Sequence, residues 1–382
     1  MTMWLILFGS LFLLGGASLF FLIYSLGRLP FMEVLTNGSK IMTWLISAAI
    51  VIIPTCLIWM SYTVTNAIIV LLHFTFFWGL AEILRVLAMK FDLATISRSA
   101  AALVGVLVTV VYLGVGWYQA HHVAQTEYTV TTDKKVGNLR VAFFGDSHLG
   151  STFDADGLAE HLKTIEKAKP DLLVIAGDFV DERTTKAEMI KAAQALGDVN
   201  TPYGVYYVFG NHDKALYQPG IRDFSGDDLV AELEKNGVIV LQDESILLDD
   251  RFYLVGRQDA SQEFDFGGSR ASIADLMTPL DHSKYTIVLD HQPRDYAAEA
   301  KAGADLVLSG HTHGGQMIPL MQIIQWFGIG QNDRLYGIEK RDNTNFIVTS
   351  GISDWAIQFK TGTKSESVSY THLRAHETRR HL

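Results

Sequence analysis

The segment Leu139-Arg140-Val141-Ala142-Phe143-Phe144-Gly145-Asp146-Ser147-His148 changes from mainly apolar to polar residues after Phe144. The run Leu139 to Phe144 is rich in apolar and β-branched residues and predicts a buried strand, so Asp146 and His148 follow its C-terminal end. Open α/β sheets place their functional sites at that end of the strands. Four later segments repeat this arrangement, each after an apolar run: Gly177-Asp178, Gly210-Asn211-His212-Asp213, His291, and Gly310-His311-Thr312-His313-Gly314-Gly315-Gln316.

The polar residues of these segments have the chemistry of metal ligands. Carboxylate and amide oxygens suit hard cations, and imidazole suits transition metals. A mixed set of Asp and Asn oxygens with His nitrogens fits Mn, Fe, Zn or Co better than Mg or Ca. Consecutive polar residues directly after buried strands are costly without a function, so the segments together predict a site for two metal ions.

In the type and order of these motifs, residues 138–366 resemble the calcineurin-like metallophosphoesterases. The Gly310 to Gln316 motif resembles the bacterial branch that has membrane-anchored and exported members. The resemblance implies an α/β domain of two packed β-sheets flanked by helices. It also implies the ligands of the two metals: Asp146, His148 and His313 for one, Asn211, His291 and His311 for the other, and Asp178 bridging both.

The same resemblance implies direct hydrolysis of a phosphoester, without a phosphoenzyme. Two metal ions about 3.5–4 Å apart polarise a phosphoryl oxygen and lower the pKa of a shared water, which gives a hydroxide for in-line attack. His212 then lies outside the metal ligands, where an imidazolium either stabilises developing charge or protonates the leaving oxygen. Asp213 is predicted to orient the His212 ring and to favour its charged form.

Four residues outside the compact motifs carry weaker signals. His291 also fits a hydrogen-bonded core position, but its place after a strand and before Gln292-Pro293 favours a ligand. Asp181 fits a carboxylate that supports a ligand or caps a helix better than it fits a metal ligand. Arg257 and Arg294 fit contacts with a substrate phosphate, although exposed or salt-bridged positions are the more frequent outcome for arginine.

The N-terminal third of the chain has the composition of a membrane region. A stretch of about 20 apolar residues is long enough to cross a bilayer as a helix. The first such stretch has neither a basic segment before it nor a convincing cleavage site, which favours a retained helix over a removed signal peptide. The sequence predicts four spans: Trp4 to Leu26, Ile41 to Tyr62, Asn66 to Met89, and Ala100 to Ala120.

The basic residues around these spans predict their orientation. The first connection carries Arg28 and Lys40, and the third is flanked by Arg85, Lys90 and Arg98. The N-terminus and the second connection carry no Lys or Arg side chain. By the positive-inside rule the first and third connections are cytoplasmic, which predicts a multi-pass cell-membrane protein with an extracytoplasmic catalytic domain.

The catalytic part of the chain is acidic. Between His121 and Glu366 it has 23 Lys and Arg residues against 37 Asp and Glu residues, a net charge of −14. So acidic a domain fits the phosphate backbone of a nucleic acid poorly, and we expect no nucleic-acid partner. The single cysteine, Cys56, lies in the second span, so the soluble part forms no internal disulfide. The sequence identifies no protein partner.

Composition also suggests the domain boundaries. Residues 1–120 form the membrane region, and the polar residues 121–137 are predicted to be a linker. Residues 138–366 alternate strands with helical patterns and suit one α/β domain. Residues 367–382 resemble a translated sequencing-adaptor run of non-native origin, so they are excluded from the predicted fold. This exclusion leaves the domain without a final strand.

One apolar segment bears on the substrate. Met317 to Ile329 follows the last metal motif directly and is strongly apolar. Such a segment either dips into lipid or holds an acyl chain, with Trp326 at the interface, or it is a buried part of the core. At the level of sequence both interpretations stay open.

Together these features predict a membrane-anchored phosphohydrolase with two metal ions, acting on a lipid-linked phosphoester or pyrophosphate at the outer leaflet of the bilayer. A phosphodiesterase or phosphatase for soluble nucleotides or wall fragments is the alternative among enzymes. A non-catalytic membrane sensor of phosphoesters is the alternative from another class. A binding module, however, has little need of His212 and Asp213 beside a complete ligand set.

Overall fold

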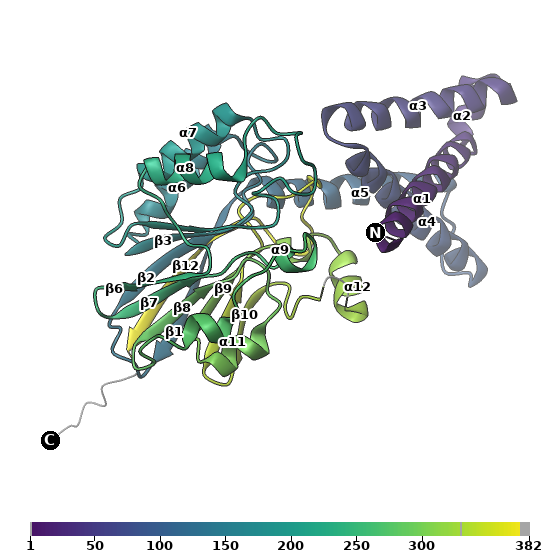
Figure 1. The fold of residues 1–382 in the computed structure, drawn as a ribbon. Helices are drawn as coiled ribbons and strands as arrows, with labels where there is room; N and C mark the ends of the chain where they lie inside the picture. The colour runs from purple at the N-terminus through teal and green to yellow at the C-terminus, as the bar shows by residue number, and fades with distance from the viewer. Residues whose placement is uncertain (1, 329–330, 375–382) are drawn as a thin grey trace. The chain divides into compact units, whose positions relative to one another are not determined.

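The apolar N-terminal stretches are helical in the computed structural model, which describes residues 2–328 and 331–374 (Figure 1). Four of the helices are long and apolar enough to cross a membrane, and a short helix, α2 (Pro30–Leu35), follows the first of them. The four are α1 (Thr2–Gly27), α3 (Lys40–Ser61), α4 (Val64–Lys90) and α5 (Arg98–His121). They agree with the predicted spans to within two residues.

The chain divides into two compact units. The first runs to Trp117 and includes Ala356–Gln358, and the second contains Tyr118–Trp355 and the chain from Phe359 onward. In the first unit, α1 packs against α3 and α4. Gly105 of α5 lies against the backbone of α4, where a Cβ would come within 2.6 Å of Trp78 Cα. Small residues at such contacts let membrane helices approach closely.

The second unit contains two six-stranded sheets. The order in the first sheet is β1 (Ala124–Thr132), β12 (Glu366–Arg374), β2 (Leu139–Phe144), β3 (Leu172–Ala176), β4 (Val205–Val208) and β5 (Ile239–Val240). The order in the second is β10 (Gly337–Arg341), β11 (Thr344–Val348), β9 (Leu306–Ser309), β8 (Tyr285–Leu289), β7 (Phe252–Gly256) and β6 (Glu244–Leu248).

Alternation along the buried strands explains why the two sheets pack face to face. On β2, Val141 and Phe143 join a core cluster that also contains Leu254 and Ile287 of the second sheet. The intervening Ala142 and Phe144 join a different cluster, formed with helices. Because successive side chains of a strand point to opposite faces, β2 is apolar on both. The shared cluster is therefore the layer between the sheets.

Helices cover the outer face of each sheet (Figure 1). The first sheet is covered by α6 (Ala155–Lys167), α7 (Lys186–Gly197) and α8 (Gly226–Lys235), and the second by α10 (Ile273–Met277) and α11 (Tyr296–Ala302). The shorter elements α9 (Ser261–Phe264), the 3₁₀ turn η1 (His313–Gly315) and α12 (Leu320–Phe327) lie in connecting segments. This four-layer arrangement and the four membrane-length helices confirm the predicted fold class.

The predicted linker and tail are both wrong in part, because each contains a strand of the first sheet. Residues Ala124–Thr132 of the supposed linker form β1, and Glu366–Arg374 form β12 between β1 and β2. The β12 strand runs parallel to β1 and antiparallel to β2, and its Val368 and Tyr370 are buried. The final strand thought to be missing is thus present, while residues 375–382 of the predicted tail lie outside the described residues.

The end of α5 also belongs to the second unit. Ser365 donates its backbone N–H to Gln119 O at 2.9 Å and its hydroxyl to Ala120 O at 2.7 Å. Two residues, His122 and Val123, separate α5 from β1. The last residues of α5 are therefore hydrogen-bonded to the chain just before β12.

Candidate metal centre

Parallel strands bring the predicted ligands together. In the first sheet β2, β3 and β4 run parallel, and Asp146, Asp178 and Asn211 follow their C-terminal ends. In the second sheet β8 and β9 run parallel, and the ligands that follow them are His291, His311 and His313. Because the two sheets pack face to face, ligands from both converge on one site.

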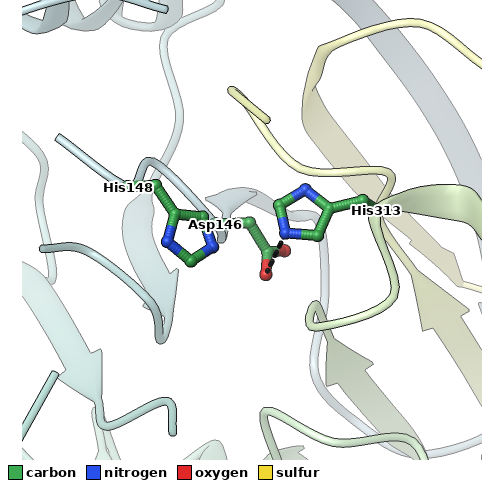
Figure 2. Close-up of side chains that lie close together, drawn as sticks. All are labelled: Asp146, His148 and His313. Atoms are coloured by element: carbon green, nitrogen blue, oxygen red, sulfur yellow. Dashed lines mark ion pairs between the residues drawn. The ribbon is translucent and has the colours of Figure 1, made fainter. Parts of the chain in front are cut away.

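One group consists of Asp146, His148 and His313 (Figure 2). Their donor atoms lie within 4.8 Å of one another, and all three residues are buried. His313 Nε2 is 3.8 Å from Asp146 Oδ1, and the rings of His148 and His313 are stacked with centroids 5.1 Å apart. Figure 2 shows the two imidazoles on either side of the carboxylate. The geometry suits a metal ion held by one oxygen and two nitrogens.

The second group consists of Asp178, His291 and His311. His291 Nε2 is 3.2 Å from Asp178 Oδ2. Asn211 Oδ1 lies 2.9 Å from His311 Nδ1 and 3.3 Å from His291 Nε2, so the amide belongs to this group. Asp178 Oδ2 is also 3.6 Å from His148 Nε2 of the first group. The carboxylate of Asp178 therefore lies between the two groups.

Two of the histidines, His291 and His148, have an oxygen atom near their Nδ1 nitrogen. His291 Nδ1 is 2.6 Å from Ala176 O, and His148 Nδ1 is 3.4 Å from Asp181 Oδ2. Metal-binding histidines typically direct their second nitrogen at such a carbonyl or carboxylate. Asp181 thus has the supporting position expected from the sequence.

A buried ion pair lies behind His313. Asp354 Oδ1 is 4.0 Å from His313 Nδ1 and 3.0 Å from Lys360 Nζ, and both Asp354 and Lys360 are fully buried. Lys360 Nζ also donates to Ser350 O at 2.7 Å. Removing one charge of a buried pair leaves the other uncompensated, so the pair fixes the environment of His313.

The backbone at the ligands adopts unusual conformations. Asp146, His148, Asp178, His311 and His313 all have positive φ, between 36° and 71°. Non-glycine residues adopt this region rarely, and such strain persists where the surrounding structure enforces it. Gly310 permits the close approach, because a Cβ there would lie 2.5 Å from Asp146 Oδ2. The turns after the strands are therefore shaped for the ligands.

Burial and the neighbouring histidines shift the pKa values of the carboxyl groups in the site in opposite directions. Burial raises the pKa of Asp146 to about 6, against the attraction of His291. Burial also disfavours ionised Asp178, but the neighbouring histidines, His291 first, hold its pKa well below the usual value. Burial and the charge of His291 lower the pKa of His311 to about 3. Ionised carboxylate and neutral imidazole are the forms that bind metals, so the shifts at Asp178 and His311 favour metal binding. At His291, by contrast, burial lowers the pKa but the carboxylate of Asp178 outweighs it and raises the pKa well above the usual value.

The residues present fit two metal ions. His148 Nε2 is buried, makes no hydrogen bond and faces the carboxylate of Asp178. A buried polar atom without a partner is costly unless a ligand satisfies it. The Asn, Asp and His side chains are donors of the kind that binds metal ions.

His212 lies beside this set and pairs with a carboxylate that the sequence did not indicate. His212 Nδ1 is 2.6 Å from Glu182 Oε1, and the two side chains are only 12% and 7% exposed. Burial lowers the pKa of His212, but the carboxylates of Asp178 and Glu182 outweigh burial and raise it to about 9. The ring also contacts the rings of Tyr217 and Trp355, whose centroids are 5.5 and 5.2 Å away.

The predicted role of Asp213 is wrong. Its carboxylate accepts the backbone N–H groups of Asp178 and Gly210 at 2.8 and 2.7 Å, and those of Phe179 and Val180 at 2.8 and 3.1 Å. Asp213 is fully buried and ties the turn after β3 to the turn after β4. It therefore supports the backbone around Asp178, while Glu182 orients His212.

The two arginines differ from each other. Arg257 is 2% exposed and pairs with Asp290 at 2.6 Å and Asp295 at 3.1 Å, so it is a salt-bridged residue. Arg294 is half-buried, donates to Gln331 Oε1 at 2.7 Å, and lies 4.4 Å from the ring centre of Phe264. Its charge contributes to the lowered pKa of His311, which places positive potential near the second group.

Glu182, Asp354 and Lys360 are the residues that motif analysis missed. Glu182 follows Asp181 directly, and two adjacent carboxylates after Gly177-Asp178 were the only signal for it. Asp354 and Lys360 lie in the loop between β11 and β12, far along the chain from the ligand motifs that precede β10. Their role depends on the placement of β12, which the sequence did not predict.

A two-sheet α/β domain with buried Asp, Asn and His side chains at its strand ends is the architecture of a metal-binding α/β protein. Residues 139–315 match the family model of the calcineurin-like phosphoesterases. An uncharacterized metallophosphoesterase of Aquifex aeolicus is 32% identical over 191 residues, 50% of this chain and 69% of that protein. The chain therefore belongs to the calcineurin-like phosphoesterase family, which confirms the resemblance seen in the motifs.

Two further relatives are informative about length. An uncharacterized metallophosphoesterase of Campylobacter jejuni is 29% identical over 232 residues, 60% of this chain but only 58% of that protein. A transmembrane protein with metallophosphoesterase domain from Danio rerio is 25% identical over 329 residues, 80% of this chain and 71% of that protein. Similarity to the second relative thus extends beyond the part matched by the family model.

Proposed function

We propose that this chain is a membrane-anchored phosphohydrolase with a binuclear metal site. Asp146, His148 and His313 would hold one ion, Asn211, His291 and His311 the other, and Asp178 would contact both. The observation that carries the proposal is the position of Asp178 Oδ2, 3.2 Å from His291 Nε2 and 3.6 Å from His148 Nε2. When bound, two such ions supply Lewis acidity toward a phosphoryl group and lower the pKa of a water.

The chain's own contribution is the placement of a proton donor. His212 is held by Glu182 beside the metal groups, with its backbone N–H donated to Asp178 Oδ1 at 2.9 Å. A positioned imidazolium either protonates the leaving oxygen or stabilises developing charge. The rings of Tyr217 and Trp355 also contact the imidazole.

For the substrate we propose a lipid-linked phosphoester or pyrophosphate at the outer leaflet. Support comes from the four membrane-length helices, the distribution of basic residues around them, and the exposed apolar side chains of α12 next to the metal motif. Soluble nucleotides or wall fragments are the alternative substrates. A purified, metal-loaded full chain assayed on both classes decides between them, and hydrolysis of soluble esters alone would reject the lipid substrate.

Hydrolysis itself separates the enzyme from a phosphoester sensor. The full chain should hydrolyse bis-p-nitrophenyl phosphate when loaded with a transition metal, because His212 and Glu182 accompany the ligand set. A chain that carries two metals and binds phosphate, yet hydrolyses no phosphoester, would support the sensor instead.

The proposed orientation has its own test. In a Cys56→Ala background, Lys135→Cys in the exposed turn after β1 should react with an impermeant thiol reagent applied from outside the cell membrane. Leu93→Cys, 77% exposed in the third connection, is the matched control and should stay protected until the membrane is broken. The reverse pattern would place the catalytic domain in the cytoplasm and reject the outer-leaflet substrates.

A further inference from the structure

An apolar helix projects from the domain immediately after the metal motif. Six residues separate His313 from Leu320, where α12 begins. Residues 314–332 contain no Asp, Glu, Lys or Arg. The largest exposed side chains of α12 are Trp326 and Phe327, which are 77% and 75% exposed. An uncharged, exposed apolar helix beside a site marks a contact surface.

The exposed apolar side chains described for this helix lie on one side of it, whereas the exposed Gln325 lies on another side. At 100° per residue, Leu320, Ile323, Trp326 and Phe327 fall within one arc, and Ile323 and Leu320 are 36% and 37% exposed. Met321 points elsewhere and holds the helix to the domain, since a Cβ at Gly315 would lie 2.8 Å from its Cβ. The helix is therefore anchored on one side and apolar toward the outside on the other.

The base of α12 and the end of α5 meet the same short segment of chain. Ile318, just before α12, donates its N–H to Thr361 Oγ1 at 3.0 Å. Four residues later, Ser365 contacts Gln119 and Ala120 of α5, both within the second unit. A bilayer spanned by α5 thus begins close to the strip of the domain from which α12 projects.

We propose that α12 inserts its exposed arc into the interfacial region of this bilayer and holds the metal motif at the membrane surface. Trp and Phe favour that region, and amphipathic helices without a spanning length bind there through buried apolar area. The proposal rests on the proposed membrane anchoring, because α5 must span the bilayer, but not on hydrolysis. A lipid-linked phosphate at headgroup depth would then lie at the level of the metal centre.

Fluorescence quenching in single-copy nanodiscs tests the contact with the full chain. In the Cys56→Ala background, Trp326→Cys or Phe327→Cys carries an environment-sensitive fluorophore. A lipid-borne quencher should reduce its emission, whereas iodide in the water should have little effect. The two substitutions at exposed positions report independently, so misfolding of one variant does not decide the outcome.

Two controls make each result decisive. Ile53→Cys in α3 should be quenched by the lipid-borne quencher, and Glu160→Cys, on the exposed face of α6, only by iodide. Quenching at Ile53 without lipid quenching at residues 326 and 327 would overturn the inference while leaving the anchoring intact. Protection of both residues from both quenchers would overturn it as well, because α12 would then be covered by protein. Loss of quenching at Ile53 would contradict the anchoring itself.

Discussion

Soluble domains usually expose charged side chains and bury aromatic ones. The chain before Gln316 buries charged side chains, whereas the chain after it exposes aromatic ones. Before it, the segments ending in Asp146, His148 and Asp178 bury carboxylates and imidazoles together, all at most 2% exposed. After it, α12 exposes Trp326 and Phe327 by 77% and 75%. Buried charge and exposed aromatic surface are each unfavourable in a soluble domain unless something binds there.

The two regions differ in the kind of partner that they suit, which is metal ions for the buried region and an apolar partner for the exposed helix. The buried donors converge from two sheets and are supported by Asp181, Ala176 and Asp354, as a site for ions requires. The exposed side chains of α12 do not converge on a common point, and they have in common only that they are exposed. The candidate metal centre thus lies next in sequence to the surface that we propose to contact lipid.

The largest effect is expected for Asp178→Asn. Because Asp178 faces both groups, the change should weaken both metal sites at once, and activity should fall by more than the roughly 10⁴-fold upper range of a lost general acid. His148→Ala should mainly weaken one site. Metal content and hydrolysis of bis-p-nitrophenyl phosphate are measured together. Full activity with normal metal in the Asp178 variant would contradict the assignment.

A smaller loss is expected for His212→Ala. The variant should keep its metals but lose about 10²–10⁴-fold in turnover, the range typical of a positioned general acid. The loss should be smaller for p-nitrophenyl esters, whose leaving group needs little protonation, than for alkyl esters. Equal losses on both esters would count against proton donation and leave charge stabilisation as the role of His212.

Variants of Glu182 and Asp213 should distinguish a residue that orients the His212 ring from one that supports the backbone. Glu182→Gln should lower turnover by about 10–100-fold, the range for residues that orient an active-site group, with the melting temperature nearly unchanged. Asp213→Ala should instead destabilise the fold, since each buried N–H left without an acceptor costs about 1–3 kcal/mol. Glu160→Gln on α6 is a surface control. A melting temperature lowered more by Glu182→Gln than by Asp213→Ala would contradict these roles.

Substitutions in the apolar helix α12 are expected to have the smallest effect on the fold. Trp326→Ser with Phe327→Ser should lower kcat/KM on a lipid phosphoester by about tenfold or more, because burying one such aromatic in lipid contributes about 1.5–3 kcal/mol. Hydrolysis of a soluble ester and the melting temperature should change little, since both side chains are exposed. Parallel losses on both substrates with a lower melting temperature would show that the segment is part of the core.

Features set by short local segments could be predicted from the sequence, whereas features set by pairing between distant segments could not. The predicted metal ligands follow the ends of local strands, so Asp146, Asp178 and the two His of Gly310 to Gln316 can be recognised from short segments. The strands β1 and β12 pair with each other across more than 240 residues, and the polar alternation of β1 resembles a linker until its partner is known. The role of Glu182 could not be predicted either, because its partner His212 lies 30 residues further along the chain. Sequence proximity favoured Asp213, whose side chain turns to the backbone of the neighbouring loop.

The exposure of α12 was equally beyond the sequence. An apolar run of this length fits a buried helix and a lipid-facing one alike, and only the packing of Met321 and the exposure of Trp326 decide against the core.

The metal content of the purified full chain, measured with its hydrolysis of bis-p-nitrophenyl phosphate, tests the central claim most directly. We expect two transition-metal ions per chain, activity that disappears when a chelator removes them, and activity that returns with Mn, Fe, Zn or Co. One ion per chain, or hydrolysis that persists in metal-free protein, would contradict a binuclear centre bridged by Asp178.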